Sequence, residues 1–83
     1  MGIRLSVHSR ENLRLADSVE FDVRESGVLV SVSRDGCVAY LHLAGGDPLW
    51  FSDLRAAEVG LGALAKVRGL RVRVIDSRQA RSA

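Results

Sequence analysis

The feature that most constrains this chain is a repeated alternation of apolar and polar residues with a period of two. This alternation is typical of a β-strand with one buried face, because successive side chains point to opposite sides of a sheet. Five segments show it and predict five strands, over residues 3–7, 19–23, 28–32, 37–43 and 70–75. We therefore expect a sheet with one apolar face that another layer covers.

The dipeptide Asp35-Gly36 predicts a two-residue hairpin loop between the third and fourth segments. A type I′ turn needs positive φ at both central residues, which Asp and Gly tolerate. The register that this loop predicts places apolar residues opposite one another three times: Val32 with Ala39, Val30 with Leu41, and Val28 with Leu43. A slip by one residue would turn the apolar side chains to the wrong face.

Ser26-Gly27 predicts a similar loop one hairpin earlier. It would set Val23 opposite Val30 and Phe21 opposite Val32. The three strands over 19–43 are then a meander.

The segment SDLRAAEVGLGALAKVR, residues 52–68, predicts a helix. Ser52 or Asp53 is a suitable N-cap, and Gly69 is a suitable residue just beyond the C-terminal end. Gly60 and Gly62 either weaken the helix or let it approach the sheet closely. Its apolar residues form one stripe at helical spacing: Leu54, Ala57, Leu61, Leu64 and Ala65.

Residues 9–17 are consistent with a short helix capped by Ser9 or with a loop. Taken together, these elements predict a single α+β domain over residues 1–83, with residues 77–83 as a frayed tail. The predicted fold is an antiparallel sheet of about five strands in the order β-β-β-β-α-β, with one helix packed on one face. A small half-open barrel with a helix is the alternative.

Composition excludes several classes of protein. No apolar run is long enough to span a membrane, and the first residues lack the continuous apolar segment of a signal peptide. Cys37 is the single cysteine, so neither an internal disulfide nor a cysteine zinc site is expected. We expect a cytoplasmic protein without a cofactor or metal, and the eleven arginines against one lysine suggest a bacterial or phage gene.

Charge is distributed unevenly along the chain. Residues 66–83 hold six basic residues and one acidic residue, whereas residues 1–65 hold six basic and nine acidic residues. The basic stretch 66–81 gives one functional hypothesis, nucleic-acid binding, with Tyr40 or Trp50 stacking on bases. The basic residues that would contact phosphates are Lys66, Arg68, Arg71, Arg73, Arg78 and Arg81. Arg71 and Arg73 are equally consistent with the polar side of a half-buried strand, opposite Glu20 or Asp22.

The outer face of the predicted sheet carries the other candidate residues. The predicted registers give one row of Asp22, Ser31 and Tyr40 and a second row of Arg24, Leu29 and His42, with Arg71 and Arg73 on the same face. Asp22, Ser31 and His42 are the residue types of a hydrolytic triad. A flat sheet, however, supplies no oxyanion-binding donors and excludes little water, so we expect no enzyme. His8 and His42 lack a third metal ligand.

We favour a small non-enzymatic binding module that recognises another protein or itself through this outer face. Leu29, Val38, Tyr40 and Ile75 make the face more apolar than a solvated surface requires. Trp50 is either an interface anchor or a lid on the core, and Phe51 is expected to brace the start of the helix. Pairing of two copies through an edge strand is a further possibility. The predicted partner-binding residues are Leu29, Tyr40, His42, Trp50, Arg71 and Arg73.

Overall fold

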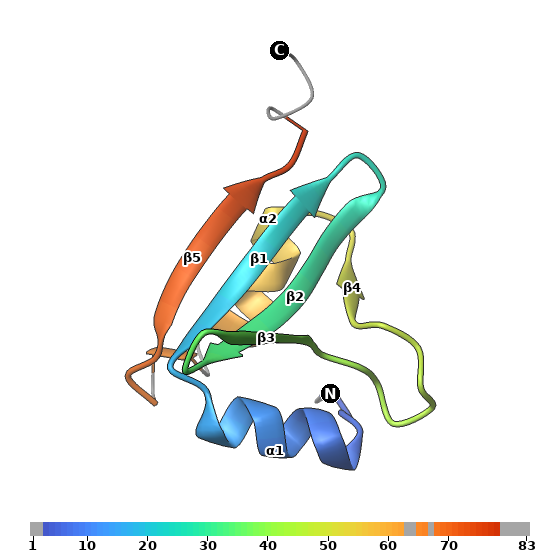
Figure 1. Ribbon diagram of the computed structural model, residues 1–83. Coiled ribbons are helices and arrows are strands. Elements are labelled where there is room, and N and C mark those ends of the chain that lie inside the picture. The colour runs from blue at the N-terminus through green and yellow to red at the C-terminus, as the bar shows by residue number, and fades with distance from the viewer. Residues whose placement is uncertain (1–2, 63–64, 67, 79–83) are drawn as a thin grey trace.

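A computed structural model describes residues 3–62, 65–66 and 68–78 and shows an α+β fold (Figure 1). The predicted fold class is confirmed: five strands form a mostly antiparallel sheet, and two helical segments pack against it. The sheet is not closed into a barrel, so the barrel alternative is wrong. In chain order the elements are α1 (Val7–Leu15), β1 (Ser18–Arg24), β2 (Gly27–Arg34), β3 (Cys37–Tyr40), β4 (Trp50–Phe51), α2 (Leu54–Ala57), η1 (Glu58–Gly62) and β5 (Arg71–Asp76).

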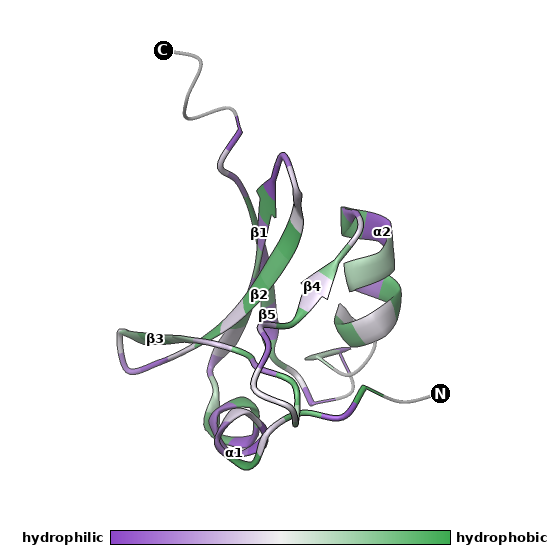
Figure 2. Cartoon of the chain, turned by 90° about the vertical axis from the view of Figure 1, so that its right-hand side faces the viewer, coloured by the Kyte–Doolittle hydropathy of each residue, from purple (hydrophilic) through white to green (hydrophobic). Residues whose placement is uncertain are grey.

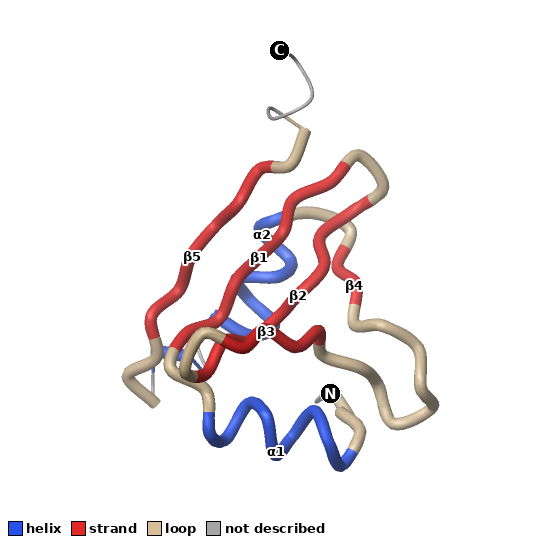
Figure 3. Tube along the Cα trace, viewed as in Figure 1, coloured by secondary structure: helices blue, strands red, loops and turns tan. Residues whose placement is uncertain are grey.

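The strands lie in the order β3-β2-β1-β5, and β4 pairs with β2 beyond the end of β3. β1–β2, β2–β3 and β2–β4 are antiparallel, whereas β5 runs parallel to β1 (Figure 3). None of the described helices is long and apolar enough to cross a membrane.

The β2–β3 hairpin confirms the turn predicted at Asp35-Gly36. Both residues have positive φ, 51° and 82°, as a type I′ turn requires. Val32 lies opposite Ala39, and the N–H of Leu41 donates to the carbonyl of Val30 at 2.9 Å.

The third pair predicted for this hairpin, Val28 with Leu43, is wrong. The chain leaves β2 after Leu41 and returns as β4, so Phe51 lies opposite Val28. Strand β3 is therefore shorter than its alternating sequence predicts, and two short strands share one side of β2.

The register predicted between β1 and β2 is wrong by two residues. Phe21 lies opposite Val30 and Val23 opposite Val28, because Glu25 and Ser26 form the loop and Gly27 already belongs to β2. A shift of two residues leaves every side chain on its predicted face, so the apolar layer is unchanged.

The strand predicted over residues 3–7 is wrong, since a helix begins at Val7. The Oγ of Ser6 caps this helix by accepting a hydrogen bond from the N–H of Ser9 at 3.1 Å. Leu5 instead forms an isolated β-bridge with Leu43. The ambiguous segment 9–17 therefore begins inside a helix that Ser6, rather than Ser9, caps, and the fold has a second helix.

The helix predicted over residues 52–68 is the second helix of the fold, and it begins where expected, after Asp53. The Oδ1 of Asp53 accepts from the N–H of Ala56 at 2.8 Å, and Gly69 has a φ of 74° beyond the helical segment. From Glu58 to Gly62 the backbone is a π-helix rather than an α-helix. Of the predicted stripe, Ala57, Leu61 and Ala65 are buried, Leu54 is half-buried, and Leu64 lies outside the described residues.

Gly60 permits a close approach of this helical segment to β4. A Cβ at position 60 would lie 2.6 Å from a ring carbon of Phe51, closer than real side chains approach. Phe51 itself is half-buried against the core. The second interpretation of Gly60, close packing, is therefore the one that the structure supports.

The core lies between the sheet and α2, and α1 closes its lower end. α2 packs on one side of the sheet, while β2 bends so that β3 projects to the opposite side (Figures 1 and 2). Phe21, Val30, Leu41 and Ala57 are completely buried. β2 is buried at six consecutive positions, Gly27–Val32, which means that both of its faces are covered.

Candidate protein-binding surface

The outer face is the side of the sheet away from α2, and the observed registers define its rows. One row runs Arg73, Glu20, Ser31, Tyr40 across β5, β1, β2 and β3, and the next runs Ile75, Asp22, Leu29, Trp50 across β5, β1, β2 and β4. The predicted rows are wrong at β1, because the two-residue register shift places Asp22 opposite Leu29 rather than Ser31.

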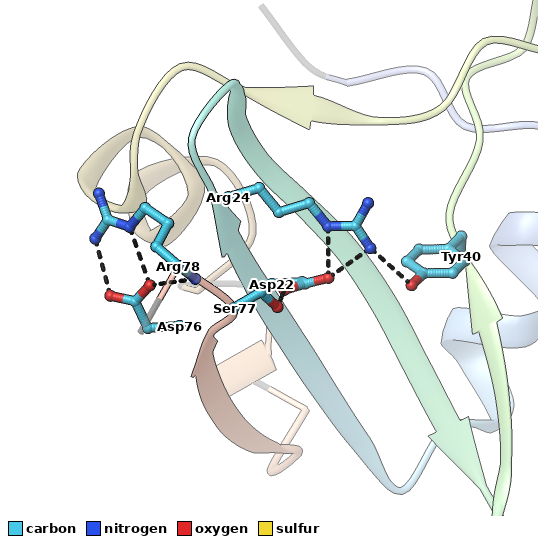
Figure 4. Close-up of polar contacts among 6 residues, drawn as sticks. All are labelled: Asp22, Arg24, Tyr40, Asp76, Ser77 and Arg78. Atoms are coloured by element: carbon cyan, nitrogen blue, oxygen red, sulfur yellow. Dashed lines mark hydrogen bonds and ion pairs between the residues drawn. The ribbon is translucent and has the colours of Figure 1, made fainter. Parts of the chain in front are cut away.

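Arg24 crosses this face and links β1 to β3 (Figure 4). Its Nε donates to Asp22 at 2.9 Å, and its Nη2 lies 3.4 Å from the Tyr40 hydroxyl. The hydrogen bond and negative charge of Asp22 raise the pKa of the Arg24 guanidinium above its usual range. Leu29, on the strand that the Arg24 side chain crosses, is only 8% exposed. The Arg24 side chain itself remains partly exposed.

Tyr40 and Trp50 lie next to each other along β2, as the partners of Ser31 and Leu29. They are 44% and 42% exposed, whereas Phe21 is buried and Phe51 is half-buried. Gly27 provides room for the indole, since a Cβ there would lie 3.2 Å from a Trp50 ring atom and 2.8 Å from the Phe51 carbonyl oxygen. The two exposed aromatic residues of the chain are therefore neighbours, held on regular strands. We call Arg24, Tyr40 and Trp50 the aromatic patch.

The six residues predicted to bind a partner do not form one surface. Leu29 is buried and His42 is half-buried, whereas Tyr40 and Trp50 lie together on the side of β2 away from β1. The backbone of His42 is bound to the start of α1: its N–H donates to the Ser9 Oγ and its carbonyl accepts from the Ser6 N–H. Arg71 and Arg73 lie on β5, separated from Tyr40 and Trp50 by β1 and β2.

Arg24 was assigned to the outer face by its alternation but was not predicted as a binding residue. The signal was present in the sequence, because Asp22 and Arg24 are two positions apart on one strand and therefore share a face. What the sequence does not reveal is that β3 bends close enough for the guanidinium to reach Tyr40.

The three residues of the hydrolytic hypothesis have other environments. Asp22 accepts hydrogen bonds from Arg24 and from the Ser77 hydroxyl, and Ser31 is buried. Within residues 3–62, 65–66 and 68–78, Ser31 and His42 share no hydrogen bond, and no three metal-ligating side chains converge. The described geometry therefore does not assemble a triad from these side chains.

The basic stretch is partly neutralised by its own fold. Arg73 pairs with Glu20 at 3.1 Å, Arg78 with Asp76 at 2.9 Å, and Arg68 donates to the Arg14 carbonyl. Lys66 and Arg71 are exposed, and Arg81 lies outside the described residues. The pairing of Arg73 with Glu20 agrees with the interpretation of Arg71 and Arg73 as the polar side of a strand opposite Glu20 or Asp22. Ser77 and Arg78 belong to the tail that the sequence predicts to be frayed. The N–H of Ser77 donates to the carbonyl of Val23 on β1, and the Nε of Arg78 donates to the carboxylate of Asp76.

Comparison with known proteins finds no protein-family model, no curated protein and no solved structure that matches this chain.

Proposed function

We propose that this chain is a small non-enzymatic binding module that recognises another protein through the aromatic patch on its outer sheet face. The observation that carries the proposal is the adjacency of Tyr40 and Trp50, both more than two-fifths exposed, in a chain with four aromatic residues. Tyr, Trp and Arg are the residue types most enriched among those that dominate binding energy at protein interfaces.

The patch is also preorganised. Tyr40 and Trp50 are on strands paired to β2, and Arg24 is held by Asp22. Side chains already fixed in the free protein lose less conformational entropy on binding. The partner that fits is a protein surface with apolar side chains for the two rings and a carboxylate or carbonyl oxygen for Arg24.

The test compares the wild-type chain with Tyr40→Ala and Trp50→Ala, each immobilised and exposed to a lysate of the source cell. A protein retained by the wild type is identified, purified and titrated against all three. We expect the dissociation constant to rise at least about 30-fold in each variant, which corresponds to roughly 2 kcal/mol.

Val59→Ala is the matched control, because Val59 is 75% exposed but lies on η1, away from the patch. Circular dichroism verifies that all variants remain folded. Equal affinities of the purified partner for the wild type and both patch variants would overturn the proposal, as would a partner whose binding depends on Val59.

A further inference from the structure

The sheet ends at β3 on one side and at β5 on the other. Beyond β3, the start of α1 binds the backbone of His42, and Leu5 forms a bridge with Leu43. β5 is the terminal strand at the other edge, and five of its six residues are exposed (Figure 1). Free edges of this kind are templates for pairing with another chain unless proline, a bulge, a covering element or charged side chains block them. β5 has no proline, and its charged residues are Arg71, Arg73 and Asp76.

The backbone of β5 shows which residues face the free edge. The N–H of Arg71 donates to Asp17 and that of Ser77 donates to Val23, so the odd-numbered residues turn their backbone groups toward β1. Val72 and Val74 consequently turn their N–H and carbonyl groups away from the sheet.

The inner side of this edge is apolar and incompletely covered. Val72 and Val74 point to the same side as the core but remain 39% and 51% exposed, because α2 packs behind β1 and β2. A groove of about 360 Å³ runs between Val72 and η1, lined also by Phe21, Glu58, Gly62 and Lys66. The edge therefore offers free hydrogen-bonding groups beside an apolar strip.

We infer that β5 pairs antiparallel with β5 of a second copy of this chain, and that the pairing is centred on Val74. Only even-numbered residues face the edge in each copy, so the two-fold axis is perpendicular to the sheet. The two copies of α2 then lie on the same side of one continuous sheet. Such an isologous pair is the commonest form of protein dimer.

The positions of the arginines exclude two registers. Centring on Val72 places Arg71 opposite the partner's Arg73, and centring on Arg73 places Arg73 opposite itself. Like charges directly opposite destabilise a sheet. Centring on Val74 instead places Arg73 opposite the partner's Ile75 and Arg71 opposite the partner's Ser77, whose hydroxyl contacts Asp22. This register still pairs residues 72–76 and brings Arg71, which has no ion pair among the described residues, toward a carboxylate.

The inference does not depend on Tyr40 and Trp50, which are separated from β5 by β1 and β2. Its first test is light scattering of the full chain under reducing conditions at high micromolar concentration. We expect twice the 9.0 kDa chain mass for the wild type and a single chain mass for Val74→Lys, which places two ammonium groups at the symmetry axis. Val38→Lys, at the β3 edge and 58% exposed, is the matched control and should remain dimeric.

The second test reads the register and does not rely on a destabilising variant. In a Cys37→Ser background, Val74→Cys should form a disulfide-linked dimer under mild oxidation, because directly opposed residues have Cα atoms about 5.5 Å apart. Arg73→Cys should link far less, because residue 73 then lies opposite residue 75. A monomeric wild type, a dimer that survives Val74→Lys, or stronger linkage through position 73 would overturn the inference. None of these results would alter the binding expected at Tyr40 and Trp50.

Discussion

β1 and β5 are parallel neighbours with the same alternating pattern, yet their environments differ. Val19 is in register with Val72, and Phe21 with Val74. The β1 members are 1% and 0% exposed, whereas the β5 members are 39% and 51% exposed. Alternation thus assigns side chains to a face, but the neighbouring strands and the position of α2 decide whether that face is buried.

The largest effect is expected when Phe21→Ala on β1 is compared with Val74→Ala on β5. Removing the buried ring should lower the free energy of unfolding by about 3–5 kcal/mol, because the core cannot fill the cavity. Val74→Ala should lower it by less than about 1 kcal/mol in dilute solution. Urea denaturation measures both, and similar losses would mean that β5 is as buried as β1.

A sharper test of the same comparison uses two valines that lie in register, Val19 on β1 and Val72 on β5. Val19→Ala should lower the free energy of unfolding by about 2 kcal/mol, from lost burial plus a cavity, and Val72→Ala by well under half of that. The same denaturation series measures the difference. A larger effect at Val72 would contradict the edge position of β5.

The outer row allows a smaller test, through the ion pair between Glu20 on β1 and Arg73 on β5. The Glu20 side chain is 15% exposed and that of Arg73 is 63% exposed. A double-mutant cycle with Glu20→Gln and Arg73→Gln should give a coupling of about 0.2–1 kcal/mol that decreases with added salt. If the coupling is absent or unaffected by salt, the two strands are not joined by this pair.

The smallest effect is expected at Glu11 and Arg14 on α1, whose ion pair shows what solvent-exposed side chains contribute. The hydrogen bond and charge of Arg14 lower the pKa of Glu11 from its ordinary 4.5. A lowered folded-state pKa stabilises the fold above the unfolded-state pKa, and this contribution disappears as the pH falls through the lowered value. Glu11→Gln should therefore be slightly less stable than the wild type at neutral pH and equal to it in strong acid, as measured by thermal unfolding. A difference that persists in acid would assign another role to Glu11.

Local patterns predicted this fold wherever one residue pair determined the geometry. Asp35-Gly36 permitted one loop conformation, so the start of the β2–β3 register could be derived. The β1–β2 register was predicted wrongly because Gly27 was placed in the loop. A glycine beside a loop is equally suited to the first position of a strand, which is where Gly27 lies. Residues 3–7 alternate like a strand, but Ser6 caps a helix, and alternation over a few residues does not distinguish these outcomes.

The candidate site was predictable in its residue types but not in its grouping. Tyr40 and Trp50 were both assigned to partner binding, but their adjacency depends on β4 taking the place that β3 leaves along β2. Arg24 reaches Tyr40 because β3 bends, and no local pattern in the sequence encodes that bend.

The parallel pairing of β5 with β1 has a consequence for how the chain acquires its structure. Glu20 and Arg73, which face each other across these strands, are 53 positions apart along the chain. As a ribosome releases the polypeptide, β1 and β2 can close their hairpin early, but one side of β1 stays unpaired until β5 has emerged. Such distant pairing slows folding and prolongs the exposure of an unpaired strand. This part of the nascent molecule is thus most vulnerable to aggregation just before β5 emerges.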